Sequence, residues 1–447
     1  MTQNPVQPID LLIKARWIMP IEPANTVLEH HAVAIRQGKI LAILPEHDAG
    51  QQFTAAQEIR LDKHLLLPGL VNLHCHAAMT LLRGIGDDTP LMTWLQEHIW
   101  PAEAKHISPE FVHDGTLLAC AEMIRGGITC FNDMYFFPEA AAKAVIESGM
   151  RAVIGLALLD FPSSYATDAD DYLAKGLAAR DALRAQPLLH FALAPHAPYT
   201  VGDRSFERIA TLTGELDLPV HLHLHETLSE IEQSLATYGV RPLERMHRLG
   251  IVSPNLIAVH AVHLNDHEIR LLAAEGASVA HCPSSNLKLG SGLAPIRDML
   301  KQGLNIGIGT DGAASNNRLD LLAEARLAAL LAKGASGDAT TMNAFQALHA
   351  ATLGGAKALG LADEIGSIVA GKSADLCAIS FDDTSMAPCY APESHAIYVA
   401  GRENVSHVWV SGKMLLENHT LTGMQKKDLE KIASIWQTII SPCENLA

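Results

Sequence analysis

The chain has 447 residues, of which 48% are hydrophobic and 18% are charged, and its formal net charge is −16. This length and composition are those of a globular protein with a large core, which excludes an intrinsically disordered chain. The negative charge argues against a nucleic-acid partner, which demands a basic surface, and favours a small neutral or cationic substrate.

Residues 1–20 mix apolar residues with charged ones, among them Asp10, Lys14 and Arg16. They lack the uninterrupted apolar core of a signal peptide or of a membrane span, so we expect a cytoplasmic protein with no membrane partner. The seven cysteines show no C-x-x-C spacing, and we expect them, Cys443 included, to be reduced and mostly buried thiols.

Residues 1–64 alternate in strand fashion, with Gly38 placed for a turn between strands at 32–35 and 40–43. After them, short apolar runs alternate with helical patterns, which indicates repeated βα units around a parallel sheet. Eight such runs are present, the number that a closed (β/α)8 TIM barrel needs, and we predict this α/β barrel over residues 65–364. The predicted strands are 65–73, 128–132, 151–157, 190–194, 219–224, 256–259, 278–280 and 305–309.

Helix signals lie between these strands. The sequence Ser108-Pro109-Glu110 predicts the start of a helix that ends at Gly126-Gly127, just before the second strand. Residues 293–300 and 319–331 also show a helical pattern.

The C-terminal part of the chain returns to strand patterns. Runs at 374–379 and 405–410 are predicted to pair with the N-terminal strands, so that residues 1–64 and 365–420 form a small β-sandwich domain built from both chain ends. Residues 421–447 are predicted to form a helix, over about 425–440, and a tail.

Histidines and carboxylates concentrate after the C-terminal ends of the predicted strands, where a parallel barrel has its active site. In strand order they are His74 and His76, Asn132 and Asp133, His196, His223 with His225 and Glu226, His260, His281, and Asp311. One histidine in such a place is usually structural, but 23 histidines scattered at random would seldom occupy so many strand ends. The pattern predicts a metal site formed by His74, His76, one histidine of the fifth strand, and Asp311.

The fifth strand offers three histidines. His221, His223 and His225 lie on one face of a regular strand, and only one of them is at the correct depth. His221 lies deeper, which favours a buried, hydrogen-bonded role, and His225 is close to the loop. Cys75 faces away from His74 and His76, so we do not expect it to be a ligand.

With these residues identified, the sequence resembles the amidohydrolase superfamily, in its cytosine-deaminase-like branch, and within it the group of 5-methylthioadenosine/S-adenosylhomocysteine deaminases. The resemblance covers nearly the whole chain. It rests on PGLVNLHCH at 68–76, MTLLRG at 79–84, His281 with SNLKLG at 285–290, GTDGAASN at 309–316 and GKSADL at 371–376.

The resemblance assigns roles to particular residues. It implies that His223 binds the metal and that Glu226, three residues later, is the general acid/base. It also implies that Glu103, after Pro101, holds the ribose hydroxyls and that His196 contacts the substrate. Because no lysine ends the fourth strand, a mononuclear site is implied, holding one divalent metal ion: zinc, with iron as the alternative.

The expected activity is hydrolytic deamination of the 6-amino group of 5′-methylthioadenosine, S-adenosylhomocysteine or adenosine, which gives the inosine analogue and ammonia. The expected catalytic residues are Glu226, which protonates N1, His260, which holds the attacking oxygen, and Asp311, which passes a proton to the leaving ammonia. Glu226 and Asp311 thereby also contact the substrate. Residues 156–165 contain no basic residue for the carboxylate of S-adenosylhomocysteine, so we expect a preference for methylthioadenosine.

Other interpretations remain open at this point. Guanine deaminases and triazine or other aminohydrolases of the superfamily share the metal ligands but do not need Glu103. A non-catalytic barrel scaffold is a remote alternative, because it predicts missing ligands. Trp94 either packs or stacks on the base. We expect a homo-oligomer, a dimer or a tetramer, although no motif fixes the number of subunits.

Overall fold

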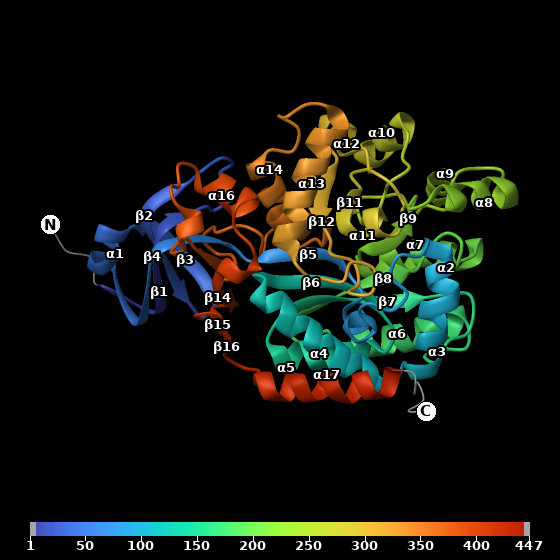
Figure 1. The fold of residues 1–447 in the computed structure, drawn as a ribbon, viewed down its shortest axis with the longest axis horizontal. Coiled ribbons are helices and arrows are strands. Elements are labelled where there is room, and N and C mark those ends of the chain that lie inside the picture. The colour runs from blue at the N-terminus through green and yellow to red at the C-terminus, as the bar shows by residue number, and fades with distance from the viewer. Residues whose placement is uncertain (1–5, 442–447) are drawn as a thin grey trace, which may run out of the picture.

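The structure is a computed structural model that describes residues 6–441. It contains a parallel barrel and a mixed β-sheet, and the sheet lies at one side of the barrel (Figure 1). Eight strands follow one another in chain order around the barrel, which confirms the predicted α/β barrel fold. They are β5 (Leu70–Cys75), β6 (Ile128–Tyr135), β7 (Arg151–Leu158), β8 (Leu189–Pro195), β9 (Val220–Leu224), β10 (Leu256–His260), β11 (Ser278–His281) and β12 (Asn305–Ile308).

Hydrogen bonds from the segment after β12 close the barrel against β5. The Asp311 N–H donates to the His74 carbonyl oxygen at 3.0 Å, and the Thr310 N–H donates to Asn72 Oδ1 at 2.9 Å. Because Asn72 is fully buried in β5, its side-chain amide serves as a pairing group where the two strands meet. The closure brings Asp311 next to the histidines of the first barrel strand.

Helices cover the outside of the barrel. The predicted helix after Ser108 is α4, where the Ser108 hydroxyl accepts a hydrogen bond from the Phe111 N–H and Gly126 is the C-cap, as predicted. The helices between the barrel strands are α4 (Pro109–Arg125), α5 (Pro138–Ser148), α6 (Ala169–Leu183), α7 (Asp203–Leu216), α8 (Leu228–Tyr238), α9 (Pro242–Arg248), α10 (Asp266–Ala274), α11 (Pro283–Lys288) and α12 (Ile296–Lys301), and α13 (Leu321–Ser336) follows the last strand.

Short helical segments surround the mouth of the barrel after β5 and connect the barrel to the C-terminal strands after α13. The first group is η1 (Ala77–Leu82), α2 (Leu91–Thr93), η2 (Trp94–Ile99) and α3 (Trp100–His106). The second is α14 (Ala344–His349), η3 (Ala350–Gly354) and α15 (Gly355–Ala358), while η4 (Thr384–Met386), α16 (Pro392–Tyr398) and η5 (Arg402–Asn404) lie between two of the C-terminal strands, β13 (Leu376–Ser380) and β14 (Val405–Val410). No helix in the described part of the chain is long and apolar enough to cross a membrane.

The second sheet is built from both chain ends, as predicted, and its eight strands form one continuous hydrogen-bonded sheet in the order β16-β15-β14-β13-β4-β1-β2-β3. The predicted turn at Gly38 joins β2 to β3, with φ of 74° at the glycine. The strands are β1 (Gln7–Ile18), β2 (Leu28–Arg36), β3 (Lys39–Pro45), β4 (Phe53–Pro68), β13 (Leu376–Ser380), β14 (Val405–Val410), β15 (Lys413–Glu417) and β16 (Thr420–Leu421), with helix α1 (Glu46–Gln52) between β3 and β4.

The predicted first barrel strand, 65–73, was wrong at its start. Residues 65–68 are the end of β4 and pair with β13 in the other sheet, while the barrel strand begins at Leu70. The chain changes sheets at Gly69, where an added Cβ would lie 2.1 Å from Thr129 Oγ1. The apolar run continues across this junction because both strands are buried, so hydrophobicity alone gave no boundary.

The predicted C-terminal helix is α17 (Lys426–Ile440), which lies along α4 (Figure 1). The Trp436 indole N–H donates to Asp114 Oδ2 at 2.9 Å, and its ring meets Phe111 edge-on at 5.2 Å. Of the described cysteines, five are buried and Cys389 is partly buried, and none forms a disulfide. Cys443 lies outside the described residues.

Arg151, at the start of β7, joins the barrel to the second sheet. Its Nε donates to Asp375 Oδ2 at 2.9 Å and its Nη1 donates to Glu364 Oε1 at 2.6 Å. Arg151 is fully buried and Asp375 is nearly so. Removing one partner of a buried ion pair leaves the other charge without compensation, which makes the pair sensitive to mutation.

We expect Arg151→Met to lower the free energy of unfolding by about 3–5 kcal/mol, because Asp375 would stay buried without its cation. Urea unfolding curves of the variant and the parent measure this difference. The matched control is Arg248→Met, since Arg248 pairs with Glu244 at the surface and its loss is expected to cost at most about 1 kcal/mol. Equal effects of the two substitutions would contradict the role of Arg151.

Candidate metal centre and active site

A cavity of about 550 Å³ opens at the C-terminal ends of the barrel strands. Its size suits a small molecule, because such sites commonly hold about 300–1,000 Å³. Seven of the predicted site residues line it: His76, Glu103, His196, His223, Glu226, His260 and Asp311. The eighth, His74, is buried behind them and contacts three of the group.

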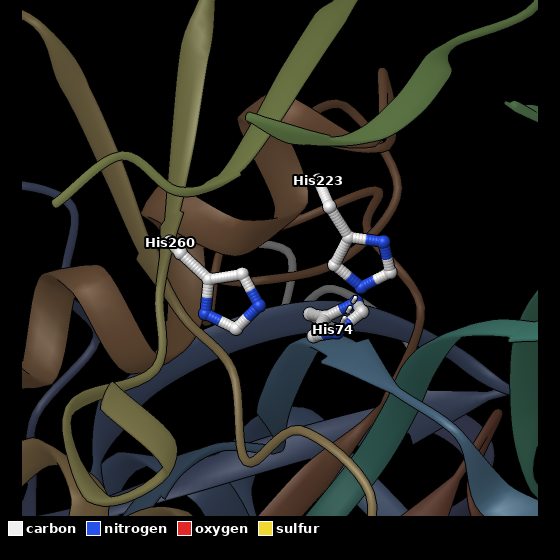
Figure 2. Close-up of side chains that lie close together, drawn as sticks. All are labelled: His74, His223 and His260. Carbon is white, nitrogen blue, oxygen red and sulfur yellow. Dashed lines mark hydrogen bonds between the residues drawn. The ribbon is translucent and has the colours of Figure 1, made fainter. Parts of the chain in front are cut away.

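The predicted metal ligands converge at the inner end of this cavity. His74 Nε2 lies 3.2 Å from Asp311 Oδ1 and 3.3 Å from His223 Nε2, and His76 Nε2 lies 3.4 Å from Asp311 Oδ1. Figure 2 shows the rings of His74 and His223 directed toward each other from opposite strands, with His260 beside them. In a tetrahedral site with bonds of about 2.0–2.1 Å, ligand atoms lie about 3.3–3.4 Å apart. These three separations match that spacing. The ligand atoms of His74, His76 and Asp311 form one group, and His223 lies against His74.

Hydrogen bonds behind the ligands fix the orientation of the imidazoles. Nδ1 of His76 donates to the Met134 carbonyl oxygen at 2.6 Å, and Nδ1 of His223 donates to the His196 carbonyl oxygen at 2.7 Å. Each donation leaves the Nε2 lone pair free on the side that faces the cluster. The two rings are therefore set to bind an ion through Nε2.

His221 and His225 take different places from His223. His221 is buried behind the cluster, and its Nε2 lies 2.8 Å from Nδ1 of His74, as the predicted buried and hydrogen-bonded role requires. His225 has a left-handed backbone, with φ of 57°, and its Nε2 accepts from the Leu243 N–H at 3.0 Å. Its ring therefore faces α9 and not the cluster.

Asp311 is held in one orientation by two donors. The Ser285 hydroxyl donates to Oδ2 at 2.6 Å and the Gly312 N–H donates to Oδ1 at 2.7 Å. Burial disfavours its charge, but the hydrogen bond and charges of His74 and His76 keep the pKa of Asp311 well below its usual value. Asp311 and His260 both have positive φ, of 60° and 69°, an uncommon conformation that functional sites often retain.

Glu226 and His260 lie beside the ligands. His260 Nε2 is 3.8 Å from Glu226 Oε2, and its Nδ1 donates to Asn286 Oδ1 at 2.8 Å. Burial raises the pKa of Glu226, an effect that His260 partly offsets. A carboxyl with a raised pKa holds a proton more readily than usual, which suits a general acid/base. Because His260 also lies near His74 and His223, these three rings form a second group that could hold an ion.

The remaining predicted contacts lie on the cavity wall. Glu103, in α3, is partly buried and accepts a hydrogen bond from the Tyr135 hydroxyl at 2.8 Å. Burial raises the pKa of Glu103 to about 7, against the effect of Tyr135. Burial lowers the pKa of His196 to about 3, so its ring is neutral. Trp94 lines the cavity while its indole N–H donates to the Ile85 carbonyl oxygen at 3.1 Å, which is compatible with packing and with stacking.

Two residues of the site had no predicted role. Tyr135 ends β6 and lines the cavity, while the Glu230 carboxylate accepts from the N–H groups of His225 at 2.9 Å and Glu226 at 2.8 Å. Glu230 is buried and so holds the backbone that carries Glu226. The sequence offers only a weak signal for it, its position at the start of a helix, where a carboxylate either faces solvent or binds free backbone N–H groups.

Comparisons with known proteins show which family this chain belongs to and which structures it is similar to. The sequence profile of the amidohydrolase family matches residues 65–415. A protein of Saccharophagus degradans named 5-methylthioadenosine/S-adenosylhomocysteine deaminase is 45% identical over 433 residues, which cover 97% of this chain and 97% of that protein. A protein of Teredinibacter turnerae with the same name is 46% identical over 429 residues, with 96% and 97% covered. The crystal structure of an adenosine deaminase from Xanthomonas campestris with bound zinc is 50% identical, covers 98% of this chain and 99% of its own, and has a TM-score of 0.96.

Proposed function

Because this chain belongs to the amidohydrolase family, we propose that it is a metal-dependent hydrolase that removes the 6-amino group of an adenine nucleoside as ammonia. The observation that carries the proposal is the placement of the His74, His76, His223 and Asp311 cluster beside Glu226 and His260, at the inner end of a nucleoside-sized cavity. The names of the two relatives support 5′-methylthioadenosine and S-adenosylhomocysteine as the substrate class.

We assign one divalent metal ion to His74, His76, His223 and Asp311. The separations between their ligand atoms and the donated Nδ1 protons of His76 and His223 support this assignment. Three imidazole nitrogens and one carboxylate suit zinc, and the bound zinc of the Xanthomonas structure supports that choice over iron. A bound ion of this kind lowers the pKa of a water molecule toward neutrality and so supplies the nucleophile.

Glu226, His260 and Asp311 then each have a separate role in the reaction. Glu226 takes a proton from the attacking water and delivers it to N1 of the purine, which makes C6 more electrophilic. His260 donates Nδ1–H to Asn286, so its Nε2 faces the cavity and holds the attacking oxygen. Asp311 takes the second proton and passes it to the leaving amine, with Ser285 fixing the oxygen that is not directed at His74.

The cavity wall supports methylthioadenosine over S-adenosylhomocysteine. In the part of the chain that the structure describes, no Lys or Arg lines the cavity, whereas Glu103, Glu226 and Asp311 do. The segment after β7 contributes only apolar residues and serines. A homocysteine carboxylate bound here would lack a cationic partner, and an unpaired charge costs at least about 1–3 kcal/mol. We expect kcat/KM for methylthioadenosine to exceed that for S-adenosylhomocysteine by at least about tenfold, and a higher value for S-adenosylhomocysteine would contradict this preference.

Ammonia release from a substrate panel tests the proposed function. The metal-replete protein is offered methylthioadenosine, S-adenosylhomocysteine, adenosine, guanine, cytosine and an aminotriazine. We expect turnover of the adenine nucleosides alone. Turnover of guanine or of the triazine in their place would support the other aminohydrolase activities of the superfamily, and no turnover together with no bound metal would support a scaffold protein.

The KM for a ribonucleoside is expected to depend on pH through Glu103. Burial raises the pKa of Glu103 to about 7, so its carboxylate, the better acceptor for sugar hydroxyls, forms only as the pH rises through that value. Tyr135 and Tyr172 face Glu103, and burial raises the pKa of both, so they stay neutral in this range. KM should therefore rise when the pH is lowered from about 8 to about 6.

Steady-state kinetics at a series of pH values measure this dependence. Glu103→Gln is the matched variant, because the amide does not titrate and its KM should be nearly constant over the same range. A parent enzyme whose KM does not change with pH would contradict the role of Glu103 as an ionised acceptor.

A further inference from the structure

Tyr135 lies between Glu103, on the cavity wall, and His76, at the inner end of the cavity. It is the last residue of β6, it is 5% exposed, and its hydroxyl donates to Glu103 Oε1 at 2.8 Å. Its ring lies edge-on to His76, with centroids 6.5 Å apart, and 5.4 Å from the ring of Phe136. The Tyr135 hydroxyl thus contacts the Glu103 carboxyl on the cavity wall, while its ring packs next to His76, one of the predicted metal ligands.

Glu103 depends on this contact for its orientation. It lies in the seven-residue helix α3, and within residues 6–441 no lysine, arginine or histidine forms an ion pair with it. The Tyr135 hydroxyl engages only one carboxylate oxygen, which leaves the other oxygen and further lone pairs for incoming hydroxyl groups. A carboxylate accepting two vicinal hydroxyls needs a fixed plane, because each bond is directional.

We propose that Tyr135 is a positioning residue that fixes Glu103 for recognition of the two sugar hydroxyls of the nucleoside. The inference rests on the proposed function and adds a determinant that acts through Glu103. A tyrosine on a barrel strand suits this purpose because its backbone is rigid, whereas α3 is short and lies outside the barrel. Because Tyr135 belongs to β6, this strand then sets the distance between the inner end of the cavity, where deamination would occur, and the part of the wall where Glu103 would bind the sugar.

Tyr135→Phe tests the proposal, because it removes only the hydroxyl. Kinetics are measured with methylthioadenosine and with its 2′,3′-dideoxy analogue, which lacks both hydroxyls. We expect kcat/KM for methylthioadenosine to fall about tenfold or more, mainly through KM, on the scale of a hydrogen bond to a charged group. For the dideoxy analogue we expect a change of less than about twofold. In Glu103→Ala, adding Tyr135→Phe should cause no further loss, because Tyr135 then has no carboxyl to position.

Tyr165→Phe is the matched control, since the Tyr165 hydroxyl is buried, has no hydrogen-bond partner within residues 6–441 and does not line the cavity. It should leave both substrates unaffected. Equal losses of Tyr135→Phe on both substrates would make Tyr135 a general structural residue, and unchanged kinetics on methylthioadenosine would remove it from recognition; either result overturns the inference. Failure of the proposed function is a separate result, namely no ammonia release by the parent enzyme from any nucleoside.

Discussion

Replacing Glu226 by glutamine is expected to leave the metal content unchanged and to lower kcat by at least about a thousandfold, on the scale of general acid/base catalysis combined with a proton relay. Glutamine keeps the shape of the side chain and its contact with Ser291, but it cannot carry a proton between the attacking oxygen and N1. The loss should appear in kcat more than in KM, since the proton transfers belong to the transition state. Metal analysis and ammonia release measure the two quantities on one sample.

Glu215→Gln is the matched control for this substitution. Glu215 is exposed on α7 and does not line the cavity, so its substitution should change neither the metal content nor kcat. Near-normal turnover of Glu226→Gln would remove Glu226 from the mechanism. Loss of metal in that variant would make it a ligand instead of a proton carrier.

Removing the metal with a chelator is expected to abolish deamination and to lower the thermal midpoint of unfolding. Without an ion, Asp311 and three buried or partly buried imidazoles remain together with no cation, and His74 Nε2 lies 3.2 Å from Asp311 Oδ1 and 3.3 Å from His223 Nε2. An ion that binds only the folded state at a thousand times its Kd adds about 4 kcal/mol of stability. Thermal melts and activity, measured as zinc or iron is added back, follow both effects and show which ion restores turnover.

His223→Ala should not recover either property when metal is added, because its Nε2 is one of the four proposed ligand atoms. His267→Ala is the matched control, since His267 is exposed at the start of α10. Full activity of the chelated parent enzyme would contradict a metal-dependent reaction.

The barrel and the gathering of its polar residues could be predicted from the sequence for one physical reason. Strands buried on both faces are continuous apolar runs, and the chain becomes polar where each run reaches the open end of the barrel. His74 and His223 are 149 positions apart, and Asp311 is farther still from His74. The fold brings them together because the strands that they end or follow are neighbours or face each other across the barrel. Alternation alone could not choose among His221, His223 and His225, because a regular strand would place all three on one face, whereas β9 ends at Leu224 and His225 turns toward α9.

Contacts between distant segments were harder to predict. The junction at Gly69 depends on the nearness of Thr129, and the hydrogen bond between Tyr135 and Glu103 depends on how α3 folds over the end of β6. Neither leaves a periodic signal, because each depends on tertiary packing instead of local pattern. The two backbone N–H groups held by Glu230 are of the same kind, since a glutamate early in a helix usually faces solvent.

The pairing of β4 with β13 has a consequence for biosynthesis. Cys377 of β13 lies 309 residues after Pro68, the last residue of β4. A ribosome that adds about 5–20 residues per second exposes β4 about 15–60 s before its partner emerges. During that interval one edge of β4 is unpaired, next to the segment that carries His74 and His76. An exposed apolar edge of this kind can aggregate, so we expect chaperones to bind the nascent chain. Truncation of the C-terminal strands would therefore not trim a dispensable tail, because it would leave that edge open for the lifetime of the protein.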